Sequence, residues 1–306
     1  MSLLVVGSVA LDTVETPAGK RDSALGGSAS YFSLAAVRYC PVHLVAVVGS
    51  DFPGQNRDLL AKEGVDLTGL QTADGPTFRW GGVYHEDMNR RDTLFTELGV
   101  FETFHPELPE SYRELPYVLL ANIDPELQLE VLEQTRSPRL VALDTMNFWI
   151  SSKLDALHRV LEKVHLFFLN DEEAKQLTGK TNVLTAAREI LRMGPRMVVI
   201  KRGEHGALTL TEHGWFSLTA FPVESLQDPT GAGDSFAGGM LGYLASRGGR
   251  LDDGELRRAV AHGTAVASHT VEHFGVDGLL ELDRAKIDAR VREVWDLSRF
   301  ELEEGA

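Results

Sequence analysis

"DPTGAGDSFAGG" (residues 228–239) packs four glycines and two aspartates into twelve positions and runs directly into the apolar residues 240–244. The apolar run predicts a helix, so the glycines lie at its amino-terminal end. Glycines there let backbone N–H groups converge on one point, and the helix end adds unpaired donors and partial positive charge. The stretch therefore predicts a pocket for an anion, formed by Gly231, Ala232 and Gly233.

Asp234 is the carboxylate at the mouth of this pocket. An anion pocket beside a base is what transfer of a phosphoryl group to an alcohol requires, because the base accepts the hydroxyl proton. The alternative is structural, since Asp is a favoured helix N-cap and glycine is common in strand-to-helix turns. The chain has no P-loop, because its only Gly-Lys-Thr, at 179–181, has Ala174 where such a loop requires glycine.

The composition indicates a folded globular protein that binds neither nucleic acid nor membranes. Apolar residues make up 43% of the 306, and the formal net charge is −15, which argues against binding a nucleic-acid backbone. The one cysteine, Cys40, excludes an internal disulfide and favours a reducing cytoplasm. No apolar run approaches the ~20 residues that span a bilayer. Residues 1–12 indicate a first strand rather than a signal peptide, and we expect the polar end 301–306 to fray.

Short β-branched runs alternate with helical patterns along the chain. The expected strands cover 3–10, 42–49, 117–122, 139–145, 165–170 and 196–203. The expected helices cover 26–39, 51–64, 127–135, 153–163 and 171–177. This alternation predicts an α/β fold with a parallel sheet covered on both faces.

Residues 76–101 break this rhythm and have no helical period. They predict two strands, over 77–85 and 92–98, joined by a turn that contains Asp87 and Asn89. A hairpin that protrudes from an α/β core is often a lid or an interface. The alternative is a meander at the edge of the main sheet.

The stretch 228–239 closely resembles the carboxy-terminal DTxGAGD signature of the ribokinase-like (PfkB) carbohydrate kinases, with Pro229 where the family often has Thr. The resemblance extends over the whole chain. It implies a three-layer α/β/α sandwich with a mostly parallel central sheet, a single kinase domain over 1–306, and a small β lid from 13–25 and 76–103. It also implies ATP as the phosphoryl donor and Asp234 as the general base.

Two glycine-containing stretches near the amino terminus, 7–12 and 25–30, resemble the substrate end of the same family. One carboxylate can accept hydrogen bonds from two neighbouring hydroxyls, and paired glycines permit close backbone approach. The resemblance implies that the acceptor is held by Asp12, Gly26, Gly27 and Ser28.

"NDEE" (170–173) matches the family's Asn-x-x-Glu motif. The match implies that Asn170 and Glu173 organise Mg²⁺ and the nucleotide phosphates, with Glu173 acting on the metal through water. The same spacing is typical of a helix capping box. Asn170 and Glu173 can cap a helix and organise Mg²⁺ at the same time.

Two further stretches, 198–208 and 260–278, resemble the segments that flank the nucleotide in the family. Lys201 replaces a common Thr and is expected at a phosphate, the alternative being a solvated lysine. The implied nucleotide contacts are Lys201, Gly203, Gly206, His262 and Gly275. Some relatives bind K⁺ beside the glycine loop, and Asp228 and Thr230 match part of such a site, which leaves that cation open.

These patterns predict an ATP-dependent kinase that phosphorylates a hydroxyl of a small polyhydroxylated molecule and dimerises through its lid. A sugar or cyclitol is favoured as acceptor, because residues 24–33 are similar to stretches of plant inositol kinases. One alternative is an adenosine-like nucleoside kinase, whose base would stack on Phe78, Trp80 and Tyr84. The other is a non-catalytic sugar- or nucleotide-binding protein on the same fold.

Overall fold

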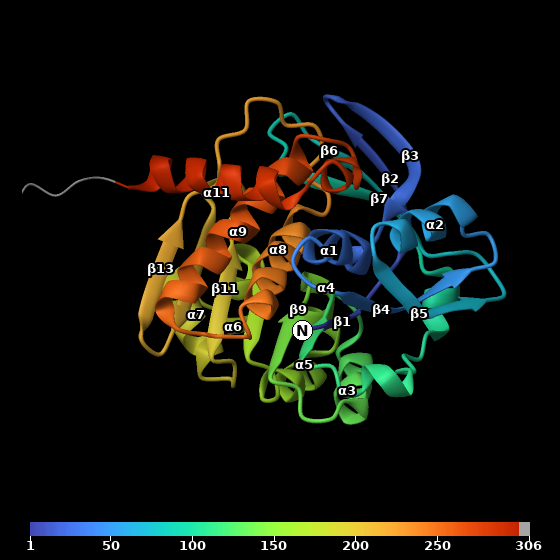
Figure 1. The fold of residues 1–306 in the computed structure, drawn as a ribbon, viewed down its shortest axis with the longest axis horizontal. Helices are drawn as coiled ribbons and strands as arrows, with labels where there is room; N and C mark the ends of the chain where they lie inside the picture. The colour runs from blue at the N-terminus through green and yellow to red at the C-terminus, as the bar shows by residue number, and fades with distance from the viewer. Residues whose placement is uncertain (300–306) are drawn as a thin grey trace, which may run out of the picture.

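The computed structural model describes residues 1–299, so the polar end at 301–306 lies outside the described residues. Within that range the central sheet has nine strands in the order β13-β12-β11-β10-β9-β8-β1-β4-β5 (Figure 1). The strands are β1 (Leu3–Val6), β4 (Val42–Gly49), β5 (Val65–Ala73), β8 (Tyr117–Leu120), β9 (Leu140–Asp144), β10 (Leu166–Asn170), β11 (Met197–Lys201), β12 (Ala207–Thr211) and β13 (Gly214–Leu218). All neighbours from β5 to β11 pair in parallel, and the hairpin of β12 and β13 adds an antiparallel edge. The predicted mostly parallel sheet is confirmed.

The sheet separates two hydrophobic cores, and alternate residues of one strand enter opposite cores. Leu3 and Val5 of β1 belong to one core, while Leu4 and Val6 belong to the other. This is the strand period of two in a sheet that is buried on both faces. The result is a three-layer α/β/α sandwich, as the resemblance implied.

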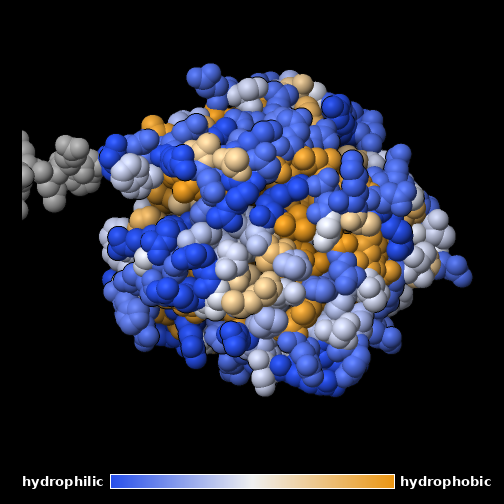
Figure 2. All heavy atoms as spheres, in the orientation of Figure 1, coloured by the Kyte–Doolittle hydropathy of each residue, from blue (hydrophilic) through white to orange (hydrophobic). Residues whose placement is uncertain are grey.

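Helices cover both faces of the sheet. The first core packs against α1 (Ser28–Ala36), α2 (Gly54–Lys62), α8 (Ala232–Ser246), α9 (Asp253–Val271), α10 (Asp277–Leu280) and α11 (Arg284–Ser298). The second packs against α3 (Pro125–Gln134), α4 (Asn147–Ser152), α5 (Leu154–Leu161), α6 (Asp171–Thr178) and α7 (Val183–Leu191). Figure 2 shows hydrophilic side chains over most of one face of the molecule, with an apolar patch right of centre. Among the described residues, no helix combines the length and the apolar character needed to cross a bilayer.

A second, four-stranded sheet has the order β3-β2-β6-β7 and stands at one edge of the molecule (Figure 1). Its strands are β2 (Ala10–Thr16), β3 (Gly19–Gly26), β6 (Arg79–Tyr84) and β7 (Arg91–Glu97). The structure thus places the two expected lid segments in one sheet, which we call the small sheet. The single strand expected over 3–10 is wrong, because the chain leaves the central sheet after β1 and enters the small sheet at Ala10.

Helices α1 and α8 pack with their backbones in contact, and this packing brings two glycine loops together. A Cβ on Gly238 would lie 2.6 Å from the carbonyl oxygen of Phe32, and a Cβ on Gly242 would lie 3.0 Å from Cα of Ala36. The amino-terminal ends of both helices carry the glycine loops that the sequence singled out. Close packing of the two helices therefore sets the distance between the expected acceptor loop and the expected anion pocket.

We expect Gly238→Ala to lower the free energy of unfolding by about 1–3 kcal/mol, because the new methyl group separates α1 from α8. Chemical denaturation monitored by circular dichroism measures this loss. Gly54→Ala is the matched control, since a Cβ at Gly54 meets nothing within 4 Å. Equal stability of the two variants would contradict the close-packing interpretation.

Candidate active site

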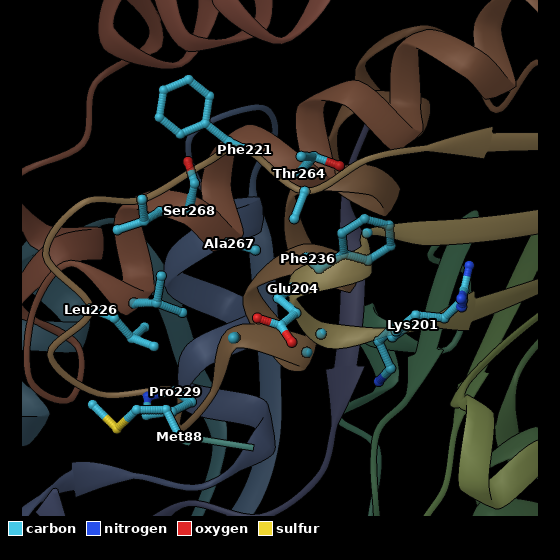
Figure 3. Close-up of a pocket in the computed structure, with 18 of the residues that line it drawn as sticks. Met88, Lys201, Glu204, Phe221, Leu226, Pro229, Phe236, Thr264, Ala267 and Ser268 are labelled. Carbon is cyan, nitrogen blue, oxygen red and sulfur yellow. The ribbon is translucent and has the colours of Figure 1, made fainter. Parts of the chain in front are cut away.

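A cavity of about 520 Å³ opens where β11 ends and α8 begins. In open parallel sheets, ligands bind beyond the carboxyl ends of the strands, and this cavity lies there. Its walls include Lys201, Gly203, Gly206, Ala232 and Gly233. Figure 3 shows Lys201 at the opposite side of the cavity from Leu226.

The remaining walls of the cavity are mostly apolar. They include Phe221, Val223, Leu226, Ala267 and Val271. The cavity therefore has a cationic end beside α8 and an apolar end that fits an aromatic ring.

The glycine loop is held in shape by Asp228, which is 1% exposed. One carboxylate oxygen accepts from the N–H of Thr230 (2.8 Å), and the other accepts from the N–H of Gly275 (3.0 Å). Gly231 follows with φ of 74°, and a Cβ there would lie 2.3 Å from the ring of Tyr31. Only glycine fits this position, because the conformation is left-handed and the space is filled.

The donors of the anion pocket differ in one residue from those expected. The N–H of Ala232 donates to the carbonyl of Pro229 (3.2 Å), so it is not free for a ligand. Within residues 1–299, no backbone carbonyl accepts from the N–H groups of Gly233 and Asp234. The N–H of Gly231 has no acceptor among the described residues either, so Gly231, Gly233 and Asp234 supply the donors available to an anion.

Asp234 lies in the first turn of α8, in a strongly charged environment. Burial, and then the charge of Asp144, raises the pKa of Asp234 to about 7, while Lys201 acts in the opposite direction. Asp12 and Glu173 add smaller upward contributions. A carboxyl group with a pKa near neutrality is suited to accept a proton from a hydroxyl.

The expected acceptor residues gather at the start of α1. Asp12 is 5% exposed and accepts from the N–H of Gly27 (3.3 Å), whose φ is 88°. A Cβ on Gly26 would lie 2.0 Å from the Asp12 carboxylate, so glycine is required there as well. Burial raises the pKa of Asp12 to about 7. Ser28, however, is engaged with Ser8, whose hydroxyl accepts from the Ser28 N–H and lies 3.1 Å from the Ser28 hydroxyl.

Asn170 and Glu173 form a complete capping box at the start of α6. The Asn170 side chain accepts from the N–H of Glu173 (2.8 Å), and the Glu173 carboxylate accepts from the N–H of Asn170 (2.7 Å). Burial raises the pKa of Glu173 to about 7, with Lys201 opposing and Asp144 adding to the shift. Asn170 and Glu173 therefore cap α6. The charges of Lys201 and Asp144 also act on the Glu173 carboxylate.

Asp144 is a site residue that the sequence analysis missed. It ends β9, is 4% exposed, and accepts a hydrogen bond from the ammonium of Lys201 (2.8 Å). Its only signal in the sequence is an aspartate directly after the apolar run that forms β9.

Arg91, the first residue of β7, was also missed. Its guanidinium lies over the ring of Trp80 at 4.8 Å, and its charge lowers the otherwise raised pKa values of Asp12 and Glu173. The small sheet also contacts the glycine loop directly, because the Thr230 hydroxyl donates to the hydroxyl of Tyr84 (3.2 Å).

Three of the expected ligand contacts differ from the prediction. His262 does not line the cavity, since it stacks on Tyr243 at 4.2 Å and its Nδ1 lies 3.1 Å from the Tyr39 hydroxyl. Burial lowers the pKa of His262 to about 4, so it is a neutral core residue, and its contact with a nucleotide stays a prediction. Gly275 likewise lies outside the cavity wall and donates to Asp228. Phe78 stacks on Phe101 (5.4 Å), so one face of its ring is already occupied within the protein.

The potassium site remains a prediction. Both oxygens of Asp228 accept from backbone amides, and the Thr230 hydroxyl is bonded to Tyr84. These side chains are already satisfied within the protein.

Comparison with known proteins agrees with this geometry. The family model for pfkB family carbohydrate kinases matches residues 3–282. The chain is 34% identical over 261 residues to a cytidine kinase of Thermococcus kodakarensis, covering 83% of this chain and 91% of that one. It is 28% identical over 290 residues to a nucleoside kinase of Methanothermobacter thermautotrophicus, covering 89% and 90%.

The fold is also shared with solved structures. The nucleoside kinase of Burkholderia thailandensis in complex with inosine superposes with a TM-score of 0.81 at 22% identity, covering 96% of this chain and 98% of that one. The aminoimidazole riboside kinase of Salmonella enterica gives 0.79 at 22% identity, covering 95% and 100%. The chain belongs to the pfkB family of carbohydrate kinases, and it is a phosphotransferase that acts on hydroxyl groups.

Proposed function

We propose that this kinase phosphorylates a nucleoside, with ATP as the donor. The similarity to a cytidine kinase, over 83% of the chain, carries the choice of acceptor. It favours the nucleoside alternative over the sugar or cyclitol that the sequence patterns favoured. The residues at the start of α1 are compatible with this choice. Asp12 and the backbone of Gly26 and Gly27 suit the hydroxyls of a ribose.

In this proposal ATP occupies the 520 Å³ cavity. The base lies at the apolar end near Phe221 and Leu226, and the phosphates lie at the end formed by Lys201 and the first turn of α8. Gly203 and Gly206 also line this cavity. A Cβ on Gly206 would lie 2.0 Å from the carbonyl oxygen of Leu218, so a larger side chain does not fit there.

The transfer is a displacement at the γ-phosphorus. The acceptor oxygen forms a bond to phosphorus, the bond to the oxygen bridging the β- and γ-phosphates breaks, and ADP leaves. Asp234 accepts the proton of the attacking hydroxyl. The free N–H groups of Gly233 and Asp234, together with the ammonium of Lys201, stabilise the charge on the transferring group.

Mg²⁺ fits beside Glu173. The capping box uses one oxygen of the Glu173 carboxylate, which leaves the other for a water of the metal, and oxygen ligands suit this cation. Bound there, Mg²⁺ supplies positive charge to the ATP phosphates.

The experiment that tests the proposal is a panel of acceptors, with ATP and Mg²⁺, in which ADP and the phosphorylated product are both measured. Cytidine, uridine, adenosine, guanosine and inosine are compared with ribose, fructose and myo-inositol. We expect a nucleoside to give a kcat/KM at least about tenfold above that of any sugar or cyclitol. Turnover of a sugar or cyclitol alone would overturn the nucleoside proposal, and binding without turnover of any acceptor would favour a binding protein.

Asp234→Asn is the control for the panel. We expect kcat to fall by roughly 10²–10⁴-fold with nucleoside affinity retained, because the amide keeps the shape of the carboxylate but cannot take up the proton. Near-normal turnover in this variant would remove Asp234 as the base.

Glu173→Gln separates the metal role from the capping role. We expect kcat to fall at least about tenfold and the Mg²⁺ concentration for half-maximal rate to rise, because an amide is a poorer partner for the hydrated cation. Asn182→Ala is the matched control, since Asn182 caps α7 by accepting from the N–H of Thr185 (3.1 Å) away from the cavity. That variant should lose about 1 kcal/mol of stability and no activity. If Glu173→Gln keeps full activity and an unchanged Mg²⁺ dependence, Glu173 acts only as a cap.

We propose that the small sheet is a lid and the interface of a homodimer. Leu94 and Leu98 are 56% and 40% exposed on or directly beside β7, where a second small sheet would cover them. Leu94→Ser should shift the sedimentation coefficient from dimer to monomer at micromolar concentration. Leu154→Ser, with the same exposure as Leu98 but at the start of α5, should leave it unchanged. A monomeric wild type would exclude the dimer.

Trp80→Ser tests the lid itself. Loss of the ring over which Arg91 lies should raise the acceptor KM and the background hydrolysis of ATP, because the site closes less completely over the substrates. Unchanged values of both would contradict a lid.

A further inference from the structure

Lys201 reaches the cleft from β11, but it is held by a residue two strands away. Its ammonium donates to the carboxylate of Asp144 at 2.8 Å, across the end of the intervening strand β10. The Lys201 side chain is 19% exposed and the Asp144 side chain 5%. An ion pair this buried carries a desolvation cost, so it contributes little stability by itself, whereas removal of one partner leaves the other charge uncompensated.

The ammonium also lies against the first turn of α8. A Cβ on Gly233 would lie 3.2 Å from the Lys201 Nζ, so the missing side chain leaves room for the ammonium. Lys201 and Gly233, whose N–H has no backbone acceptor among the described residues, therefore lie side by side in the cavity wall. An anion placed there would meet both.

Three carboxylates compete for this one ammonium. Burial by itself would lower the pKa of Lys201, but the charges of Asp144, Glu173 and Asp234 outweigh it and raise the pKa. Among the described residues, Asp144 is the carboxylate that Lys201 bonds. A salt bridge to Asp234 instead would hold the base in its charged, hydrogen-bonded form and weaken it as a proton acceptor.

The Asp144 carboxylate can hold the Lys201 ammonium in one position because hydrogen bonds hold Asp144 itself in place. Its second carboxylate oxygen accepts from the N–H of Thr145 (2.9 Å). The buried amide of Gln128 donates to the carbonyls of Ala121 (2.9 Å) and Asp144 (3.3 Å), which ties the ends of β8 and β9 together. The carboxylate thus has little freedom to follow Lys201 elsewhere.

We propose that Asp144 is a positioning residue that holds the ammonium of Lys201 at the amino-terminal end of α8, where it receives the terminal phosphates of ATP. The inference rests on the proposed use of ATP. Asp144 acts through Lys201 and does not itself touch the nucleotide.

The test is a double-mutant cycle of Asp144→Asn and Lys201→Met, read out by calorimetric binding of ATP and of adenosine to the full chain. We expect Asp144→Asn to weaken ATP binding roughly tenfold or more, the size of a lost charge-assisted contact, and to leave adenosine binding unchanged. In the Lys201→Met background, the same substitution should change the Kd for ATP less than about twofold, because there is no ammonium left to position.

Glu126→Gln is the matched control, since it removes the carboxylate of an exposed ion pair with Lys153. It should change neither affinity. Should Asp144→Asn fail to fold, Asp144→Glu takes its place, because it keeps the charge but displaces the ammonium by one methylene group, and it should weaken ATP binding severalfold.

Two results would overturn the proposal. One is an equal loss of ATP affinity from Asp144→Asn with and without Lys201, which would mean that Asp144 acts independently. The other is unchanged ATP affinity in a folded Asp144→Asn or Asp144→Glu protein. Both readouts are binding constants, so they decide the question even if no nucleoside is turned over and the proposed acceptor is wrong.

Discussion

The paired hydrogen bonds of Asp228 are the constraint on which the site depends. This single buried carboxylate accepts one hydrogen bond from the N–H of Thr230 in its own loop and another from the N–H of Gly275 in a distant loop. Burial opposes the charge on Asp228, and these amides stabilise it. They hold the chain so that Gly231 turns in the left-handed region and α8 begins with Ala232 and Gly233 in the cavity wall. The base, the anion pocket and the contact with Tyr84 of the small sheet all follow from this turn.

The second organising feature is an excess of negative charge in the cleft. Asp12, Glu173 and Asp234 each have a pKa raised to about 7, and Asp144 is also raised. ATP brings more negative charge into the same place. Lys201 and the amides of α8 compensate part of it, and Arg91 of the small sheet adds a second cation near Asp12 and Glu173. This charge balance is the physical reason to expect that a divalent cation accompanies the nucleotide.

Local chemistry along the chain was sufficient to predict some parts of the site and not others. The glycine loop before α8 and the capping box at Asn170 each lie within a few residues, so their spacing predicts an anion pocket and a helix cap. The acceptor role of Asp12, which is distant in sequence from Gly26 and Gly27, came from the resemblance to the family. The pair of Asp144 and Lys201 joins strands 57 residues apart, and no periodicity links them. The same holds for Arg91, whose place over the site depends on how the small sheet folds back.

The errors have similar causes. His262 was expected at the nucleotide because residues 260–278 resemble a segment that flanks the nucleotide in the family, but its ring packs on Tyr39 and Tyr243. Strand β5 was not predicted because Gly69 and the adjacent polar residues Gln71 and Thr72 interrupt the alternation in its sequence, "VDLTGLQTA". One apolar run, 3–10, was expected to form a single strand. The structure divides it between β1 of the central sheet and the start of β2 in the small sheet.

The central claim is that Asp234 accepts the proton, with a pKa that its surroundings raise to about 7. The most direct test is the pH dependence of the rate with nucleoside and ATP both well below their KM values, at saturating Mg²⁺, because this rate reports the ionisation of the free enzyme. The base must be deprotonated to act. The account predicts a rate that is constant well above pH 7, is about half-maximal near pH 7, and approaches a tenfold fall per pH unit at lower pH. A rate that stays constant down to about pH 5 would show that no carboxyl group with a raised pKa takes part, and would contradict the account.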